Sequence, residues 1–320
     1  MRVLLTGATG FVGGRLHAPL VAAGHEVICG TRSPAAARRR DSQRTWQALD
    51  LADERSVDAA LEGCEAAYFL VHAMTGARSG YGKRELEGAQ RFARVAARRK
   101  LRRIVYLGGL APPPEVLSAH LASRLAVGRA LREGEVTCLE LRASVIVGHG
   151  SASFRILRDL AARLPAMVLP RWLENRTEPV AIDDVISALV AGLAVPLAAS
   201  DWYDLPGPEA LSGREMLLRT ARLLGVKPRT LPIPLLTPRL SARWLWLISG
   251  VDYRLACELV DGLRRDLLAQ RRGFGALAGL PPSIGFDEAA RRALGEERAG
   301  TLRTLAARGW EQLVRTLAPN

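Results

Sequence analysis

Residues 2–24 read RVLLTGATGFVGGRLHAPLVAAG, a short apolar run, a glycine-rich turn and a segment with apolar residues at helical spacing that stops at Gly24. The pattern predicts a buried strand, a turn and a helix. Gly7 permits a tight turn, Gly10 lets a ligand approach the backbone, and Gly13 lets the helix pack closely on the strand. Free N–H groups and the helix dipole favour an anion there, so the turn is expected to hold the pyrophosphate of a dinucleotide.

Strand and helix patterns go on alternating through the first half of the chain. Their spacing calls for parallel strands with helices on both faces of the sheet. We therefore predict an α/β fold with a doubly wound parallel sheet, the Rossmann architecture that binds dinucleotides. Extended segments are expected at residues 2–5, 25–32, 46–51, 65–74, 102–110 and 136–148.

The pattern loosens after the sixth strand, where helices and proline-broken segments dominate. Residues 1–195 are predicted to form the dinucleotide-binding domain, and a strand near residues 201–207 is expected to return to its sheet. Residues 208–320 are predicted to form a smaller, mostly helical C-terminal lid on the substrate side. Within it, Ser212 with Glu215 three residues later predicts a helix that opens with a capping box.

The end of the second strand bears on the kind of dinucleotide. It reads Gly-Thr-Arg-Ser at residues 30–33, and no acid falls between Glu26 and Asp41. NAD-binding chains tend to place an acid there for the ribose hydroxyls, whereas the planar fork of Arg32 suits a 2′-phosphate. We therefore predict NADP(H) in preference to NAD(H). A solvated loop charge is the alternative for Arg32, and it is the favoured interpretation of the arginine run 38–40.

Two further strand ends are expected to contact the cofactor. Asp50 and Leu51 should lie beside the adenine, although Asp50 could instead cap the next helix. The end of the fourth strand should pass under the cofactor, with His72 facing the nicotinamide or packed as a structural histidine. The whole set expected to hold the cofactor is Thr6, Gly7, Gly10, Phe11, Val12, Gly13, Thr31, Arg32, Asp50, Leu51, Leu70, Val71, His72, Gly108, Arg124 and Ala143.

Several segments together resemble the atypical short-chain dehydrogenase/reductase superfamily, namely TGATGFVG, GTR and LRASVIVG. The segments YLGGLAPP, HLASRLAVGRALREG and EPVAIDDV make the chain similar to the bacterial YbjT-like proteins of that superfamily. The similarity covers residues 1–195 and continues more loosely beyond them. NmrA-like regulators and the nucleotide-binding subunit of respiratory complex I share it less specifically. The resemblance implies a Rossmann domain that binds NADP(H) or NAD(H), and it leaves the substrate open.

The resemblance also implies where catalytic residues should lie. In the wider superfamily a Tyr moves the proton of the substrate oxygen, and a Lys four residues later, one helical turn on, assists it. None of the five tyrosines has Lys at that spacing, and the strand end where a Ser or Thr is usual reads Gly108-Gly109. His120 and Arg124 occupy the places of the Tyr and the Lys.

His120 and Arg124 make an acid–base dyad chemically feasible. Histidine donates protons near neutral pH, and arginine can contact ribose hydroxyls although it does not exchange protons. The alternative is that both side chains only contact cofactor or solvent. Tyr81, expected on a loop, is a third candidate acid. A quinone, flavin or conjugated alkene needs no side-chain acid, because water can supply the proton.

These observations favour an NADP(H)-dependent oxidoreductase that acts on a hydrophobic carbonyl, quinone or enone without the Tyr-x-x-x-Lys dyad. Trp244 and Trp246 in the lid suit such a substrate, and ordinary lid packing is the alternative for them. The second hypothesis is a non-catalytic NADP(H)-binding regulator or assembly factor. The third is an epimerase, dehydratase or lyase that keeps its cofactor bound.

Composition limits the setting and the partners. The four cysteines lie far apart and match no zinc spacing, and the N-terminal apolar run is too short for a secretory signal, so a reduced, cytoplasmic protein without a metal site is expected. The formal charge of +13 is spread over many segments without interleaved aromatics, which argues against nucleic-acid binding. The sequence contains no apolar run of about 18 residues, so no transmembrane helix is predicted. Peripheral membrane contact stays open, as does the choice between a monomer and a homodimer through helices 83–99 and 121–133.

Overall fold

The computed structural model describes residues 1–71, 81–110, 119–163, 166–169, 171–226, 229–232 and 265–297. The strands of its central sheet are β1 (Arg2–Leu5), β2 (Glu26–Thr31), β3 (Thr45–Ala48), β4 (Ala66–Phe69), β5 (Arg103–Gly109), β6 (Cys138–Ala143) and β11 (Asp201–Asp204).

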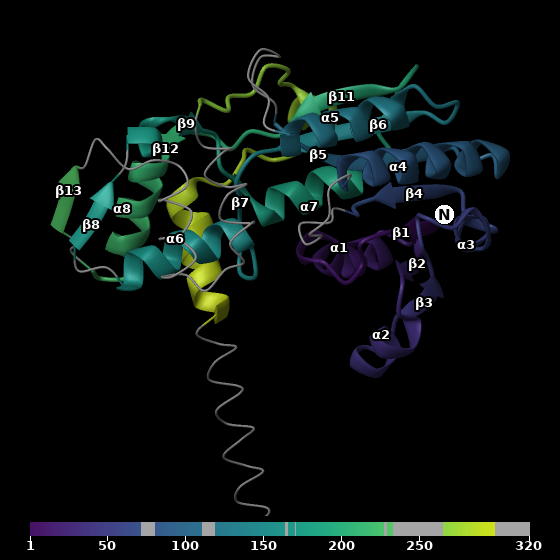
Figure 1. Ribbon diagram of the computed structural model, residues 1–320, viewed down its shortest axis with the longest axis horizontal. Helices are drawn as coiled ribbons and strands as arrows, with labels where there is room; N and C mark the ends of the chain where they lie inside the picture. The colour runs from purple at the N-terminus through teal and green to yellow at the C-terminus, as the bar shows by residue number, and fades with distance from the viewer. Residues whose placement is uncertain are drawn as a thin grey trace, which may run out of the picture.

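The seven strands form one parallel sheet in the order β11-β6-β5-β4-β1-β2-β3 (Figure 1). From β1 the chain builds outward through β2 and β3 to one edge, returns to β4, and then builds to the other edge. The strand order therefore reverses between β1 and β4. In sheets of this kind ligands bind in the crevice outside the carboxyl ends of the strands, at the reversal.

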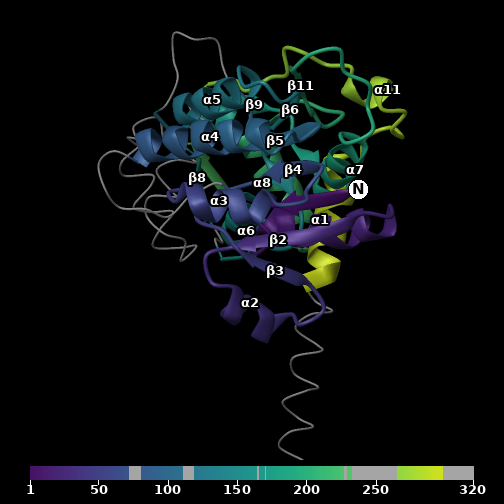
Figure 2. The same cartoon turned by 90° about the vertical axis from the view of Figure 1, so that its right-hand side faces the viewer.

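Helices cover both faces of the sheet (Figures 1 and 2). One face carries α1 (Phe11–Ala22) and α7 (Ile182–Ala191), and the other carries α3 (Glu54–Leu61), α4 (Tyr81–Arg98) and α5 (Ala119–Arg132). The short helix α2 (Pro34–Arg40) lies beside β3 at the edge of the sheet. The predicted doubly wound α/β fold is confirmed.

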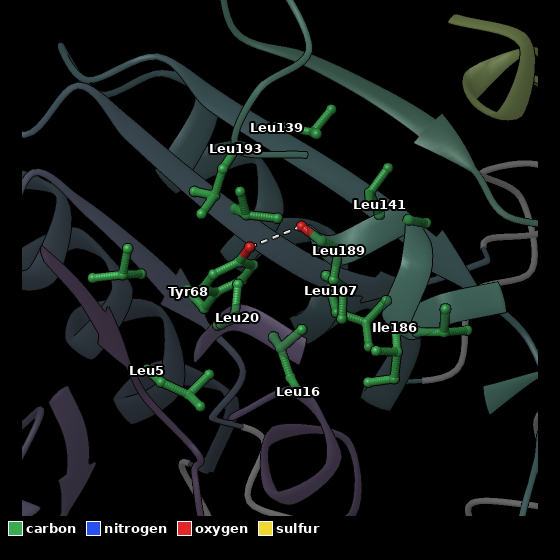
Figure 3. Close-up of a cluster of buried hydrophobic side chains, with 14 of the residues drawn as sticks. Leu5, Leu16, Leu20, Tyr68, Leu107, Leu139, Leu141, Ile186, Leu189 and Leu193 are labelled. Carbon is green, nitrogen blue, oxygen red and sulfur yellow. Dashed lines mark hydrogen bonds between the residues drawn. The ribbon is translucent and has the colours of Figure 1, made fainter. Parts of the chain in front are cut away.

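The core between the sheet and α1/α7 includes the fully buried Tyr68 (Figure 3). Tyr68 on β4 is fully buried, and its hydroxyl donates a 2.8 Å hydrogen bond to the backbone carbonyl of Leu189 on α7. Buried tyrosine hydroxyls need such a partner. Burial raises the pKa of Tyr68 far above its ordinary value. This tyrosine ties β4 to α7, and its hydroxyl proton is engaged in that hydrogen bond.

The strand expected near residues 201–207 is β11, which pairs with β6 at the sheet edge, Trp202 beside Glu140. A separate core joins three helices: α6 (Ala152–Arg163), α8 (Gly213–Leu223) and a helix over residues 286–297. Figure 1 shows the last of these in yellow against α6. α6 therefore packs in the helical layer although it precedes residue 195. The division at residues 195 and 208 stays a prediction.

Short strands complete this helical part. β7 (Ile146–Val147) pairs with β10 (Val180–Ala181), β9 (Arg176–Thr177) with β12 (Leu211–Ser212), and β8 (Ala166–Leu169) with β13 (Arg229–Pro232). A 3₁₀ turn, η2 (Arg171–Glu174), lies between β8 and β9 in the chain, and the one-turn helix α11 (Phe274–Leu277) follows β13.

Two helix starts test the capping expectations. At α8 the Ser212 hydroxyl accepts from the Glu215 N–H at 3.1 Å, and the Glu215 carboxylate accepts from the Ser212 N–H at 2.8 Å, so the predicted capping box is present. At α3 the cap is Asp53, whose carboxylate accepts from the Arg55 N–H. The alternative that Asp50 caps this helix is therefore wrong, because the helix begins one turn later than that assignment requires.

The segment 265–297 is attached to the rest of the protein by carboxylates that accept backbone N–H groups. Glu178 accepts from Ala269 at 2.6 Å, and Asp204 accepts from Gln270 and Arg271 at 2.7 and 3.0 Å. Both carboxylate-bearing residues are buried. Charged acceptors make such hydrogen bonds stronger than neutral pairs. The segment is thus fixed through its main chain rather than through its own side chains alone.

Among the described helices, none is long and apolar enough to cross a membrane. Cys29, Cys64 and Cys138 are free and buried, and burial raises the pKa of the Cys29 and Cys64 thiols to about 11. Cys257, Trp244, Trp246 and His72 lie outside the described residues.

Candidate functional site

The glycine turn between β1 and α1 lies at the point where the strand order reverses. Gly7 has φ +66°, a left-handed conformation that side chains disfavour, and a Cβ there would lie 2.7 Å from the carbonyl oxygen of Leu70. A Cβ at Gly13 would lie 2.3 Å from the carbonyl oxygen of Gly7, so the first turn of α1 rests directly on the turn before it. The Gly10 N–H closes the turn on the Gly7 carbonyl at 2.9 Å.

The turn is also tied to β4. The Thr6 N–H donates to the Tyr68 carbonyl at 3.1 Å, and the Thr6 hydroxyl accepts from the Leu70 N–H at 2.8 Å. Gly10 begins α1 without a side-chain cap, so no side chain of the cap occupies the N–H groups at Phe11 and Val12. Helix starts of this kind bind phosphate. The turn therefore fits a pyrophosphate, with close backbone approach guaranteed by the glycines.

The end of β2 presents an arginine to solvent. Arg32 is exposed, and its guanidinium forms no hydrogen bond or ion pair with any described residue. Thr31 beside it accepts from the Ser33 N–H at 3.3 Å, which shapes the strand end. Gly30 packs against Leu49, since a Cβ at Gly30 would lie 2.5 Å from a methyl group of Leu49. This end of β2 therefore offers an uncompensated cation and no carboxylate.

Asp50 and Leu51, predicted beside the adenine, lie just beyond β3. Asp50 is exposed, and its carboxylate accepts from the Ala52 N–H at 2.9 Å. Leu51 is half-buried against α4, where Arg91 donates to the Leu51 carbonyl at 2.5 Å. The strand end is thus held in place by both neighbouring helices.

The ends of β5 and β6 form a second corner, beside α5. Arg124 on α5 extends its guanidinium to the end of β5, where Nη2 donates to the Leu107 carbonyl at 3.4 Å. Gly109 makes room for it, since a Cβ there would lie 3.5 Å from Arg124 Cδ. The Nε–H of Arg124 is buried without a partner among the described residues. The Arg124 guanidinium has five N–H donors and makes one long hydrogen bond here, so it can still donate to an acceptor atom of a ligand.

The other dyad candidates are placed only by their backbone. His120 lies in α5, one turn before Arg124, and Tyr81 is the first residue of α4. The expectation that Tyr81 lies on a loop is wrong, because the amphipathic pattern that forms α4 extends back to it. The side chains of both residues lie outside the described part of the structure, so the His120–Arg124 dyad stays a prediction.

Tyr106 at this corner is not an acid at neutral pH. Its hydroxyl donates to the Arg124 backbone carbonyl at 3.2 Å, and burial, its largest influence, raises its pKa to about 12. Tyr106 therefore anchors α5 to β5. Val71 is the last residue described after β4, and Ala143 pairs with Gly109 at the end of β6.

A buried charge cluster at this corner escaped the sequence analysis. Glu140 on β6 is fully buried, and its carboxylate accepts from Arg142 Nε and Arg132 Nε, both at 2.8 Å. Gly108 lies beneath it, since a Cβ at Gly108 would lie 3.0 Å from Glu140 Oε1. The glycine that stands where the superfamily usually has a Ser or Thr is thus packed closely against the carboxylate of the next strand.

These features define a Rossmann-type α/β protein with a glycine turn at the point where the strand order reverses. Residues 7–133 match the family described as NAD(P)H-binding. The matched segment includes the glycine turn, the Arg32 strand end and the helix that carries Arg124.

The chain is also similar to individual known proteins. It is 29% identical over 236 residues to the ceramide reductase of Caulobacter vibrioides, covering 72% of this chain and 73% of that protein. A nucleoside-diphosphate-sugar epimerase from Staphylococcus aureus aligns with TM-score 0.71 and 16% identity, covering 91% of this chain and all of that one. The UDP-glucuronic acid 4-epimerase of Bacillus cereus, solved with NAD, aligns with TM-score 0.69 and 14% identity over 91% of this chain and 97% of that one. At these identities the two structures share the fold.

Proposed function

We propose that the chain is an NADP(H)-dependent reductase that transfers hydride to a hydrophobic carbonyl, quinone or enone and works without a Tyr-x-x-x-Lys dyad. The observation that carries the proposal is Arg124, whose guanidinium has an unpartnered, buried Nε–H at the carboxyl end of β5. A buried donor of this kind calls for an acceptor from a ligand. The likeness to a ceramide reductase supports reduction as the reaction.

In this proposal, residues at the carboxyl ends of the strands bind different parts of the cofactor and the substrate. The backbone at Gly7, Gly10 and Gly13 holds the pyrophosphate, and Arg32 holds a 2′-phosphate through its planar fork. Bound NADPH supplies the hydride. Arg124 binds the ribose hydroxyls or the oxygen on which negative charge develops, where a fixed cation stabilises the transition state. For a ketone, His120 gives the proton that completes the alcohol. For a quinone or an enone, water gives the proton that completes the hydroquinone or the saturated ketone.

The relative named above suggests a long-chain lipid as the substrate. An amide carbonyl accepts hydride poorly because nitrogen donates electron density to it, whereas a ketone accepts hydride readily. We therefore infer that the reducible group is a ketone or an activated alkene on an apolar chain. A cytoplasmic location fits the free, buried cysteines.

Turnover with a panel of substrates tests this function. NADPH oxidation is followed at 340 nm with ketone-bearing ceramide-type lipids in micelles, quinones and enones, each with native protein and with Arg124→Met. We expect steady oxidation with at least one lipid ketone and a loss of about 10-fold or more in kcat/KM in the variant. Tight NADPH binding without turnover on the whole panel would contradict the proposal.

That contrary outcome would favour the second candidate, an NADP(H)-binding regulator. One observation supports it: Tyr68 and Tyr106 are both committed to backbone carbonyls, so neither supplies an acid. Titration with NADP(H) and NAD(H) tests the cofactor separately. We expect tighter binding of NADP(H), and equal affinities or a preference for NAD(H) would overturn that part.

A further inference from the structure

The Glu140 carboxylate lies in an unusual position for a charge. Its side chain is 1% exposed, on β6, which is paired on both sides in the sheet. Arg132 Nε reaches it from α5 at 2.8 Å, and Arg142 reaches it along β6 through Nε at 2.8 Å and Nη2 at 3.2 Å. Taking a carboxylate out of water is expensive unless it is paired and hydrogen-bonded, and here every oxygen has an arginine donor.

The helix backbone of α5 rests directly on this carboxylate. A Cβ at Gly128 would lie 2.4 Å from Glu140 Oε1 and 2.6 Å from Oε2, so only glycine fits between them. Arg132 follows Gly128 by one helical turn and closes over the same carboxylate. Glu140 therefore contacts α5 at two successive turns and fixes both its height above the sheet and its rotation.

The same face of α5 carries the ligand-directed arginine. Arg124, Gly128 and Arg132 are spaced four residues apart, which places them in one row along a helix. The first of them reaches the Leu107 carbonyl with its guanidinium, and the other two rest on Glu140. A shift of α5 at Glu140 thus moves the guanidinium of Arg124 relative to the end of β5.

The far side of the cluster is also fixed. The Arg142 guanidinium lies over the Trp202 ring, with its central carbon 4.0 Å from the ring centroid. Because Arg142 is held by this ring and by the strand, it serves as a rigid support for Glu140. Apolar residues of equal volume often stabilise a fold as well as a buried ion pair does, so geometry is the better explanation for the charges.

We propose that Glu140 is a positioning residue that acts through α5 to hold Arg124 at the site of the nicotinamide ribose and the reacting oxygen. The proposal rests on the proposed function for the identity of the ligand. The position of Arg124 is thus set by a residue on the neighbouring strand β6, which touches neither cofactor nor substrate.

A double-mutant cycle on NADPH binding tests the proposal. The Kd of NADPH is measured by fluorescence for the native chain, Glu140→Gln, Arg124→Met and the double variant. We expect each single substitution to weaken binding about 10-fold and the double variant to be no more than about 2-fold weaker than Arg124→Met. The proposal would be overturned if the effects of Glu140→Gln and Arg124→Met on the Kd multiplied in the double variant. It would also be overturned if Arg124→Met left the Kd unchanged. The readout needs no turnover, so a failure of the reductase assignment leaves this test intact.

Two further variants guard against a simple loss of folding. Arg132→Met removes only the contact from α5 and leaves Glu140 paired with Arg142, so it should weaken NADPH binding in the same direction, by about 3-fold or more. Asp201→Asn is the matched control: it removes the ion pair between Asp201 on β11 and Arg271 and changes no contact of Glu140 or α5. It should leave the Kd within about 2-fold. Equal weakening by Asp201→Asn and Arg132→Met would mean general destabilisation and would overturn the proposal.

Discussion

The glycine turn and the β5–α5 corner both bring a helix into contact with the sheet through glycines, but what each glycine faces is different. Gly13 faces the backbone carbonyl oxygen of Gly7 in the turn just before it, which would lie 2.3 Å from a Cβ at Gly13. Gly128 faces the side-chain carboxylate of Glu140, on the next strand, with 2.4 Å. The Gly7 carbonyl belongs to the backbone, which every sequence supplies, whereas the Glu140 carboxylate is lost when residue 140 is substituted. The packing of the turn therefore depends on backbone alone, whereas the packing of the corner depends on which side chain stands at residue 140.

Gly13→Ala should have the largest effect, because the clash is with backbone on both sides and no side chain can move away. We expect NADPH affinity to fall about 100-fold and the free energy of unfolding to fall by about 3 kcal/mol. Isothermal titration and chemical unfolding measure the two. Gly14→Ala is the matched control: its Cβ would lie 3.7 Å from the nearest atom, an ordinary contact, and the helix should gain about 0.5–1 kcal/mol. Equal effects at the two positions would remove the steric account of the turn.

Gly128→Ala should come next, since a carboxylate can shift where backbone cannot. We expect a loss of about 2 kcal/mol in unfolding free energy, as Glu140 is pushed from its arginines. Gly275→Ala, with nothing within 4 Å of its built Cβ, should be neutral. If Gly128→Ala and Glu140→Ala are combined, most of the Gly128→Ala clash should disappear. A fully additive double variant would show that the glycine is needed for something other than the carboxylate.

Arg32→Glu should act on one cofactor only. We expect NADP(H) binding to weaken by at least about 10-fold, or about 1.4 kcal/mol, with NAD(H) within about 2-fold of the native value. Arg55→Glu on α3 makes the same change in net charge away from β2 and should leave both affinities unchanged. Parallel weakening of NADP(H) by both variants would mean a long-range charge effect rather than a contact.

Ser212→Ala should be the mildest, because the capping box of α8 lies far from either corner. We expect a loss of about 1 kcal/mol at pH 7. Hydrogen bonds from the Ser212 N–H, and then from its hydroxyl, lower the pKa of Glu215. The contribution of Glu215 is therefore present above its unfolded pKa and is lost as the pH falls through its folded value. Chemical unfolding at pH 7 and pH 3 should show the difference between native protein and variant shrinking in acid.

Local patterns carried the prediction of the sheet, the first helix and the capping box, since each depends on residues close together in the chain. Asp50 and Asp53 show the limit of this: both are acids before the same helix, and only the actual hydrogen bond to Arg55 distinguishes them. Glu140 was missed for a deeper reason. A charged residue in an alternating strand indicates the solvent face, and the burial of Glu140 depends on its pairing with Arg142 and with Arg132, which reaches it from α5. The alternation Glu140-Leu141-Arg142, with two opposite charges on one face, was the available signal.

The carboxylates that hold residues 265–297 have a consequence for the order of events during synthesis. Glu178 and Asp204 are synthesised before residues 269–271, whose backbone N–H groups they accept in the folded protein. Until those residues are made, we expect the two carboxyl groups to stay in contact with water. Docking of the late segment then closes the sheet edge beside β11. A ribosome-bound chain that ends before residue 265 should thus carry an open, acidic edge that the finished protein no longer shows.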